Sequence, residues 1–474
     1  MKSALLLFLI LAVSAFAAER ARPNILFCIA DDASYAHFGA NGDPAIRTPV
    51  FDRVCRDGVR FTGSHCSSPS CTPSRGAILT GRPFLQLEEG GNLWSTLQKA
   101  KFAVYPDLLE AAGYTIGLQG KGWGPGDFKP GGFTRNPSGP GFKSFAQFRK
   151  TAPAGKPWCF WFGSTDPHRP YDRGSGSKAG IDPAKVRVPP YLPDEPITRE
   201  DLADYMAEIE RFDHDTGEII AQVEAAGELE NTLIIVTSDN GLPFPRAKAN
   251  LYDSGTHMPL AIMWKEHIAP GRQIDDFVSH TDFAPTFLEA AGVPVPKEII
   301  GRSLLPLLTS GRSGQVESGR DKVFVGRERH ANVRSGRVGY PARAIRTADF
   351  LYIVNLAPDR WPAGDPEELP ESPQGIYGDI DEGPTKAWMI DNRDSSKVAT
   401  PWPLAFEKRP AEELYDLRKD PNEMRNVAQQ PEYAGALKKM FSELESWRKE
   451  MKDPSLDGNP SHFDGFPYYG KKGR

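Results

Sequence analysis

The chain has few cysteines, no excess of charge of either sign, and no long hydrophobic run beyond its first residues. Its net charge is −5, from 57 basic and 62 acidic residues, so the composition gives no reason to expect nucleic acid as a partner. An anionic substrate would have to be drawn in by a local basic pocket. No later apolar run is long enough to cross a bilayer, so we expect no transmembrane segment.

The N-terminus has the pattern of a secretory signal peptide. A basic start at Lys2 precedes a short apolar stretch from Ala4 to Val13, and Ala15-Phe16-Ala17 follows as an A-x-A cleavage site. The stretch is too short to favour a membrane span. The cleavage point has no cysteine, so we expect no lipoprotein anchor. We therefore expect residues 1–17 to be removed and the protein to be exported, to the periplasm or the extracellular space.

The five cysteines do not define a disulfide pattern. They are Cys28, Cys55, Cys66, Cys71 and Cys159, and an odd number leaves at least one unpaired in an exported protein. Cys28 and Cys159 lie in apolar runs typical of strands, so we expect them to be small buried hydrophobes rather than bridge partners.

The length and the order of the predicted elements indicate an α/β protein of two domains. Strands alternate with helices in residues 18–310, which predicts a catalytic domain with a large, mainly parallel sheet between helices. Residues 311–474 are expected to form a smaller sheet-plus-helix domain, with an irregular excursion at 358–412 and a loosely held tail after Asp453. The predicted strands are 23–30, 114–118, 158–163, 233–236, 323–325, 350–354 and 413–417, and the predicted helices are 48–54, 105–112, 198–226, 280–291 and 434–451.

Carboxylates follow two of the predicted strands. Asp31 and Asp32 come directly after the first apolar run, and Asp239 and Asn240 follow a later one. Ligands bind at the carboxyl edge of open α/β sheets, and hard oxygen ligands suit Ca²⁺ or Mg²⁺. Taken singly, the two aspartates could be solvated loop carboxylates, and Asn240-Gly241 an ordinary turn. Together they favour a metal site.

A second feature is the stretch Cys71-Thr72-Pro73-Ser74-Arg75, followed closely by Leu79-Thr80-Gly81-Arg82. Because Pro73 disfavours helix at the residue before it, we expect a helix to begin near Ser74, with Cys71 just outside its positive end. A bare Cys-x-Pro would indicate a buried or disulfide-bonded cysteine. The longer pattern resembles the signature of the sulfatase family, whose cysteine is oxidised after translation to formylglycine. The hydrated aldehyde of that residue is the nucleophile.

The resemblance covers nearly the whole mature chain and implies an alkaline-phosphatase-like fold. It also implies that a formylglycine-generating enzyme modifies Cys71, and that this residue joins the four oxygen-bearing side chains around one Ca²⁺, with Mg²⁺ as the alternative. The basic groups that match family positions around the formylglycine and the sulfate are Arg75, Lys121, His168 and Lys248. Positive groups stabilise charge on sulfuryl oxygens, and an imidazole can protonate the departing atom. Taken singly, each could instead be a surface charge or a core histidine.

The chain departs from the family at one position. The family usually carries Lys-x-His where this sequence has Lys121-Gly122-Trp123. An indole cannot accept or transfer the proton that the histidine handles. We therefore expect the contact to the formylglycine hydroxyl to come from elsewhere or to be absent.

Further stretches resemble the sulfamidase (heparan N-sulfatase) branch. They are Ser238 to Pro245, Asn250-Leu251-Tyr252, Asp166-Pro167-His168-Arg169 and Glu413 to Leu417. This resemblance implies removal of sulfate from the nitrogen of glucosamine at the non-reducing end of a glycan. It also places Arg329 and His330 where the branch has substrate-recognition groups.

Three alternatives remain open at the level of sequence. The enzyme could be an O-sulfatase acting on another sulfated polysaccharide, or a phosphomonoester or phosphonate hydrolase of the same superfamily. The protein could also be an inactive binder of sulfated glycans, which is disfavoured because the nucleophile, the metal set and all four basic groups are present.

Overall fold

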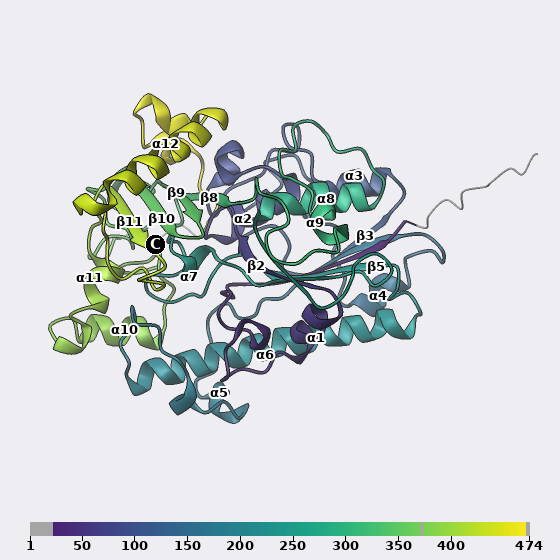
Figure 1. Ribbon diagram of the computed structural model, residues 1–474, viewed down its shortest axis with the longest axis horizontal. Coiled ribbons are helices and arrows are strands. Elements are labelled where there is room, and N and C mark those ends of the chain that lie inside the picture. Colours follow the sequence, from purple (N-terminus) through teal and green to yellow (C-terminus); the bar gives the residue numbers. More distant parts are fainter. Residues whose placement is uncertain (1–21, 370–371, 373, 471–474) are drawn as a thin grey trace, which may run out of the picture.

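A computed structural model describes residues 22–369, 372 and 374–470 and contains two sheets (Figure 1). The predicted signal peptide at residues 1–17 lies outside the described residues. The larger sheet has seven strands in the order β3-β4-β1-β5-β6-β2-β7, and the smaller has four in the order β11-β10-β9-β8. Among the described residues, no helix combines the length and the apolar character needed to span a bilayer.

The strands are β1 (Asn24–Ala30), β2 (Val59–His65), β3 (Thr115–Gly120), β4 (Trp158–Gly163), β5 (Thr232–Ser238), β6 (Leu260–Met263), β7 (Arg272–Ser279), β8 (Lys322–Arg327), β9 (Ala342–Thr347), β10 (Phe350–Asn355) and β11 (Glu412–Asp416). The α-helices are α1 (Pro49–Asp57), α2 (Cys71–Thr80), α3 (Tyr105–Ala111), α4 (Phe145–Arg149), α5 (Ser175–Lys178), α6 (Pro196–Ala225), α7 (Asp253–Thr256), α8 (Phe283–Ala290), α9 (Leu305–Thr309), α10 (Pro384–Asp391), α11 (Pro401–Phe406) and α12 (Ala434–Glu450).

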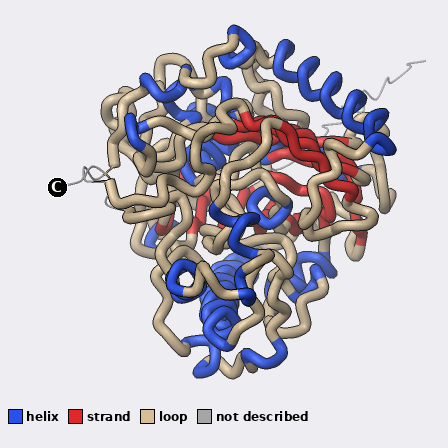
Figure 2. The backbone as a smooth tube through the Cα atoms, turned by 90° about the vertical axis from the view of Figure 1, so that its left-hand side faces the viewer, coloured by secondary structure: helices blue, strands red, loops and turns tan. Residues whose placement is uncertain are grey.

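The large sheet is mainly parallel, as predicted. Strands β3, β4, β1 and β5 run in one direction, β2 and β7 pair in parallel, and only β6 runs antiparallel to both of its neighbours. Figure 1 shows α3, α8 and α9 on one face of this sheet and α1, α4 and α6 on the other. Figure 2 shows the same layering from the side, with the strands inside and helices around them.

The position of β1 in the middle of the sheet explains why its sequence is apolar throughout. Ile25, Phe27 and Ile29 face the layer that contains α2, α3 and α8, whereas Leu26 and Cys28 face the layer that contains α1, α4 and α6. All five side chains are fully buried. A strand covered on both faces needs apolar residues at every position, not at alternate ones. Cys28 and Cys159 are both core residues, as expected.

The small sheet is antiparallel and is also covered on both faces. Met440 and Leu444 of α12 pack on Tyr352 and Leu414, while the other face meets residues 251–252 just before α7. The small sheet therefore lies against the segment that follows Lys248. Residue 310 lies between β7 and β8, and the division into two domains at that position stays a prediction.

Several predicted features differ in the structure. The sequence did not predict strands β2, β6, β7 and β9. Three of them carry polar residues at alternate or central positions and β6 is short, so none stands out as a long apolar run. The predicted helix 280–291 begins as a 3₁₀ turn, and the excursion at 358–412 contains α10 and α11. The tail after Asp453 is not loosely held: Phe463 is buried, and Asn92 Nδ2 donates to its carbonyl at 2.9 Å.

Candidate active site

The pairing of β1 with β5 brings the two carboxylate-bearing turns together. Ala30 lies opposite Ser238 in the parallel register, so the residues that follow these two strands leave the sheet side by side. Asp31, Asp32 and Asp239 are all buried, with exposed fractions of 1% or less. The expected meeting of these side chains at the carboxyl edge of the sheet is thus what the structure shows.

Helix α2 begins at Cys71 and not near Ser74. Ser70 is the N-cap in an extended conformation, and the first helical bond runs from Ser74 N to Ser70 O at 3.0 Å. Pro73 takes the third helical position, where the missing N–H has no partner to lose. The preference of Pro73 against helix at the preceding residue is therefore outweighed.

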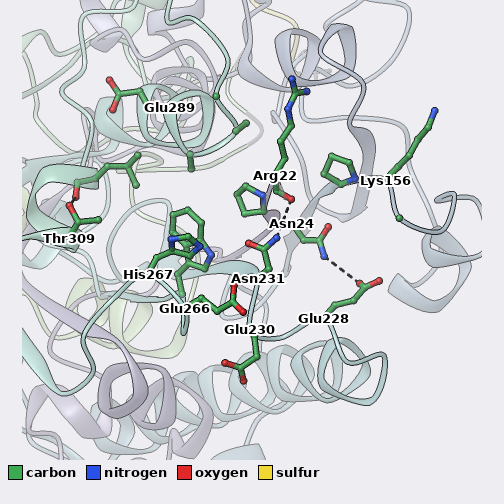
Figure 3. A pocket seen from close by; sticks show the side chains of 18 of the residues that line it. Arg22, Asn24, Lys156, Glu228, Glu230, Asn231, Glu266, His267, Glu289 and Thr309 are labelled. Atoms are coloured by element: carbon green, nitrogen blue, oxygen red, sulfur yellow. Dashed lines mark hydrogen bonds between the residues drawn. The ribbon is translucent and has the colours of Figure 1, made fainter. Parts of the chain in front are cut away.

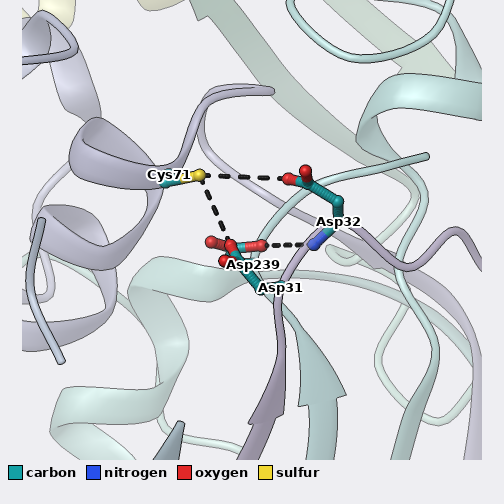
Figure 4. A group of neighbouring side chains, drawn as sticks. All are labelled: Asp31, Asp32, Cys71 and Asp239. Carbon is teal, nitrogen blue, oxygen red and sulfur yellow. Dashed lines mark hydrogen bonds between the residues drawn. The ribbon is translucent and has the colours of Figure 1, made fainter. Parts of the chain in front are cut away.

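This start of α2 places Cys71 over the carboxylates (Figure 4). Its Sγ lies 3.5 Å from Asp31 Oδ1 and 3.9 Å from Asp32 Oδ1. One oxygen each from Asp31, Asp32 and Asp239 and the Cys71 sulfur all lie within 4.8 Å of one another. Cys71 and the candidate metal ligands therefore form one cluster.

Asn240 is the fourth candidate ligand. Its Nδ2 donates to Asp32 Oδ1 at 2.7 Å, whereas its Oδ1 is buried and has no hydrogen-bond partner among the described residues. A buried amide oxygen without a donor is costly unless something else satisfies it. A hard cation held by carboxylate and amide oxygens fits that requirement.

The backbone at Asp32 is held in an uncommon conformation. Its φ is +79°, in the left-handed region that a residue with a side chain rarely adopts. The Asp32 N–H donates to Asp239 Oδ1 at 3.1 Å, which helps to maintain this turn. Such strain costs about 1–3 kcal/mol and is typically found at functional sites.

Three cations surround the three carboxylates. Arg75 Nε donates to Asp239 Oδ2 at 2.7 Å, and Lys121 Nζ lies 2.7 Å from both oxygens of Asp31. Lys248 Nζ lies 2.7 Å from Asp32 Oδ2. The charges of these six side chains balance, so a divalent cation added to them would leave a net positive pocket for an anion.

Burial and these cations act on the carboxyl groups in opposite directions. Burial alone raises the pKa of Asp31, but the ammonium of Lys121 and the guanidinium of Arg75 more than offset it and hold that pKa well below its usual value. For Asp32, burial dominates and raises the pKa, although Lys248 acts to lower it.

His168 lies at the open side of the cluster, after β4. Its Nδ1 donates to the carbonyl of Arg169 at 2.6 Å, which leaves Nε2 facing Asp32 Oδ2 at 3.9 Å. The side chain is 35% exposed, whereas the side chain of Asp32 is fully buried. Nε2 is therefore the nitrogen that a substrate can reach.

Trp123 lies where the family usually has a histidine. It is 3% exposed, and its backbone N–H and carbonyl are both held by Asn136, at 3.0 Å and 2.9 Å. Its indole nitrogen packs against α2 near Gly76 and has no hydrogen-bond partner among the described residues. Trp123 thus acts as a core residue under the helix that carries Cys71.

Arg329 and His330, the two residues predicted to recognise substrate, contact different parts of the protein. The Arg329 guanidinium is buried and donates to the carbonyls of Asp464, Phe466 and Pro467, at 3.0 to 3.3 Å, so it holds the C-terminal tail. His330 Nδ1 lies 2.8 Å from the hydroxyl of Ser70, the residue before Cys71. Burial lowers the pKa of His330 to about 4, so the ring is neutral at pH 7. The substrate-contacting roles of both residues stay predictions.

One side chain in this cluster was missed in the sequence. Asp381 Oδ2 lies 2.8 Å from Lys248 Nζ, the same ammonium group that contacts Asp32 Oδ2 at 2.7 Å. It belongs to the excursion at 358–412 and is 133 residues from Lys248. No local pattern marks it, because the contact depends on how the smaller sheet docks.

A separate hollow of about 960 Å³ lies at the opposite, amino-terminal edge of the sheet (Figure 3). It is lined by Asn24 at the start of β1, by four acidic side chains, and by Arg22 and Lys156. Its acidic lining does not suit an anionic substrate. The cluster around Cys71 is therefore the candidate active site.

Buried carboxylates that could hold a hard metal ion, surrounding cations and a cysteine at one edge of an α/β sheet suit the hydrolysis of anionic groups. The family model "Sulfatase" matches residues 23–151 and 140–293, and the model "N-sulphoglucosamine sulphohydrolase, C-terminal" matches residues 246–392. The chain belongs to the sulfatase family. It is accordingly a hydrolase of sulfate esters or sulfamates.

Characterised relatives share most of the chain. Human N-sulphoglucosamine sulphohydrolase is 30% identical, with 92% of each chain covered. An ulvan-active sulfatase of Formosa agariphila is 26% identical, covering 91% of this chain and 81% of its own. An N-acetylglucosamine-6-O-sulfatase of Bacteroides thetaiotaomicron is 24% identical, covering 93% of this chain and 88% of its own.

Solved structures share the fold. A protein in complex with its substrate D-glucosamine-2-N,6-O-disulfate superposes with a TM-score of 0.64 at 21% identity, covering 93% of this chain and 99% of its own. A phosphonate monoester hydrolase of Agrobacterium radiobacter gives a TM-score of 0.63 at 19% identity, covering 92% and 97%. At these identities the likeness establishes the architecture, which sulfatases and phosphonate hydrolases have in common.

Proposed function

We propose that this protein removes sulfate groups from a sulfated carbohydrate, with formylglycine at position 71 as the nucleophile. The observation that carries the proposal is the place of Cys71 at the first position of α2, 3.5 Å from Asp31 and beside Lys121 and Lys248. Burial raises the pKa of the Cys71 thiol well above its ordinary value, so an unmodified cysteine would be a poor nucleophile here. Conversion to an aldehyde hydrate removes that difficulty.

The substrate proposed first is N-sulfoglucosamine at the end of a heparan- or heparin-type glycan. The human relative carries this activity in its name, and the C-terminal family model that matches residues 246–392 has the same name. That range includes Lys248, His330 and Asp381, all near the cluster. The second candidate is the O-sulfate of another polysaccharide, supported by the ulvan-active and 6-O-sulfatase relatives.

We propose that Asp31, Asp32, Asp239 and Asn240 hold one Ca²⁺, with Mg²⁺ as the alternative, together with the modified residue 71. The unpartnered Asn240 Oδ1 and the buried carboxylates support this ligand set. When bound, the ion supplies a Lewis acid that stabilises negative charge on a sulfate oxygen.

The basic side chains of the site have separate roles in this proposal. Lys121 and Lys248 donate to the sulfuryl oxygens, and their ion pairs with Asp31 and Asp32 hold them in place before substrate arrives. Arg75 orients Asp239. His168, whose Nε2 is left free by the hydrogen bond of Nδ1 to Arg169, protonates the departing nitrogen or oxygen of the sugar.

Turnover by the purified protein tests this proposal. The panel contains N-sulfoglucosamine, 6-O-sulfated and 2-O-sulfated sugars, 4-nitrophenyl sulfate and 4-nitrophenyl phosphate. We expect sulfate release from one or more sulfated sugars, the fastest from N-sulfoglucosamine, and slower release of phosphate. Faster hydrolysis of the phosphate than of every sulfate would favour a phosphomonoester hydrolase, and no turnover at all would favour a sulfated-glycan binder.

Maturation and export are part of the proposal. Residues 1–17 direct the chain to the periplasm or the extracellular space, and a formylglycine-generating enzyme acts on the motif at Cys71. N-terminal sequencing of the exported protein should begin at Ala18. Retention of the first residues in the exported protein would contradict the cleavage site.

A further inference from the structure

We propose that Asp381 is a specificity-determining residue, which accepts a hydrogen bond from an N–H or O–H of the substrate next to the transferred sulfuryl group. This inference rests on the proposed function, because it assigns the group that recognises the leaving part of that substrate. It arises from four features of the Asp379–Thr385 segment, called the strap below.

First, the strap is tied to the small sheet at one end. Asp379 accepts hydrogen bonds from the guanidinium groups of Arg327 and Arg334 and, at 3.1 Å, from the N–H of Ala331. Its carboxyl group and both arginines are buried. Breaking a buried charge pair is expensive, so this end of the strap is rigidly placed.

Second, the strap is tied to the large sheet at its other end, where α10 lies beside α6 (Figure 1). The N–H and hydroxyl of Thr385 donate to Asp201 Oδ2 on α6, at 3.1 Å and 2.7 Å. Asp201 also pairs with both terminal nitrogens of Arg169 at 2.8 Å, directly after His168. A Cβ on Gly383 would lie 2.4 Å from Arg169 Cζ, so only glycine lets the strap approach this closely.

Third, these two anchors place Asp381 at the mouth of the cluster. Lys248 Nζ lies between Asp32 Oδ2 at 2.7 Å and Asp381 Oδ2 at 2.8 Å. One oxygen of Asp381, one oxygen of Asp32 and a ring nitrogen of His168 all lie within 4.8 Å of one another. The Asp381 side chain is 27% exposed, so a substrate can reach it, whereas Asp32 is fully buried.

Fourth, the charge of Asp381 excludes a role in binding sulfate oxygens. Burial alone raises its pKa, but Lys248 and His168 more than offset this and hold the pKa below its usual value, so the group is ionised. A carboxylate repels sulfate oxygens but is a strong acceptor for N–H and O–H groups. Because it lies beside His168, it faces the part of the substrate that leaves.

A second metal site at Asp32, His168 and Asp381 does not fit this geometry. The Lys248 ammonium already lies within hydrogen-bond distance of both carboxylates, and a cation between them would be repelled by it. A purely structural role, in which Asp381 only holds Lys248 for sulfate binding, makes a different prediction from ours. Sulfate binding is common to all substrates, whereas leaving-group recognition is not.

The experiment compares Asp381→Ala and Asp381→Asn with the wild type on three substrates. N-sulfoglucosamine offers an N–H, a 6-O-sulfated glucosamine offers hydroxyl groups, and 4-nitrophenyl sulfate offers no donor beside the sulfate. For at least one of the sugars, Asp381→Ala should lower kcat/KM by roughly tenfold to a hundredfold, the range for a lost hydrogen bond to a charged group. On 4-nitrophenyl sulfate the loss should stay below about threefold. Which sugar responds identifies the donor.

The matched control is Glu382→Gln on the same strap, whose side chain is 68% exposed and pairs with Lys386. It should leave all three activities within about twofold of the wild type. Thermal unfolding checks the fold of each variant. Asp381→Asn is isosteric and keeps an acceptor oxygen without the charge, so it replaces Asp381→Ala in the test if Asp381→Ala does not fold. Asp381→Asn should lose less than Asp381→Ala, again only on the sugars.

Three outcomes would overturn the inference. Equal losses on all three substrates would mean that Asp381 only holds Lys248, and loss of bound metal in the variant would mean that it belongs to a metal site. Wild-type activity on 4-nitrophenyl sulfate alone would mean that no leaving-group donor is recognised, while sulfate hydrolysis itself would stand. Wild-type inactivity on every sulfate would instead contradict the proposed function.

Discussion

Arg75 Nε donates to Asp239 Oδ2 at 2.7 Å, and both side chains are completely buried. The pair joins α2, which carries Cys71, to the turn after β5, 164 residues further along the chain. Removing one partner of a buried ion pair typically costs 3–5 kcal/mol, because the other charge is left uncompensated. The pair therefore sets the position of residue 71 relative to the candidate metal ligands. The other parts of the site can then be tested one at a time.

Conversion of Cys71 to formylglycine is the first prediction. Peptide mass analysis of active protein should show the aldehyde at position 71, and Cys71→Ala should abolish turnover. The control is Cys55→Ala, a half-buried cysteine outside the cluster, which should keep full activity. A fully active enzyme with an unmodified thiol at position 71 would contradict the modification.

Metal binding is tested at Asp239. Asp239→Ala should lose bound metal and activity together, because it removes one candidate ligand and the carboxylate that Arg75 Nε contacts at 2.7 Å. Metal content is measured by elemental analysis, and Ca²⁺ added to chelated wild-type protein should raise the unfolding temperature, as any ligand of the folded state does. Asp275→Asn, at the outer edge strand β7, is the control and should bind metal normally. Full activity of exhaustively chelated, metal-free protein would contradict the metal site.

Leaving-group protonation is tested at His168. Removal of a positioned general acid typically costs ~10²–10⁴-fold in rate, so His168→Ala should lose this much on a sugar sulfate or sulfamate. The loss should be much smaller for an aryl sulfate, whose leaving oxygen scarcely needs a proton. The exposed His214 of α6 provides the control, and His214→Ala should behave as wild type on both substrates. Equal losses for His168→Ala on both substrates would mean that His168 binds sulfate instead.

Acid should destabilise the protein through His257. The His257 and Tyr35 rings are stacked, with their centroids 4.0 Å apart. Burial lowers the pKa of His257 to about 4 from an ordinary value of 6.5, although Asp253 acts in the opposite direction. Between pH 6.5 and 4 the unfolded chain binds a proton that the folded chain does not. The stabilisation is therefore complete above pH 6.5 and is lost as the pH falls, by about 3 kcal/mol in total for this residue.

Denaturant unfolding between pH 4 and 7 measures this effect. His257→Gln should flatten the pH dependence of the free energy of unfolding in that window. His214→Gln, on an exposed face, should leave the pH dependence unchanged. An unchanged slope in His257→Gln would show that its ring is not held neutral by burial.

The variant Arg329→Ala distinguishes a structural role of this residue from a role in substrate recognition. Its guanidinium is hydrogen-bonded to the tail carbonyls of Asp464, Phe466 and Pro467, so Arg329→Ala should lower the free energy of unfolding by roughly 1.5–3 kcal/mol. Proteolysis within residues 461–470 should become faster. If the substrate-binding prediction holds instead, KM for the sugar should rise while the tail stays protected.

The sequence by itself determined the class of fold and most of the candidate site. Strands such as β1 and β5 are buried on both faces, so they must be apolar at every position, and this is visible in a single sequence. The polar residues that end these strands fall at one edge of a parallel sheet whatever the details of packing. The motif at Cys71 is local, so its chemistry could be inferred before its surroundings were known.

The tertiary structure decided what depends on distant pairing. The start of α2 at Cys71 follows from packing that outweighs the local preference of Pro73. Strands such as β2, which lies between β6 and the edge strand β7, are half polar and have no continuous apolar signal. Asp381 reaches Lys248 only because the strap is held by Arg327 of β8 and Arg334 of the following loop at one end and by Asp201 of α6 at the other. No spacing in the chain encodes that contact, since its geometry is set by how the two sheets are held together.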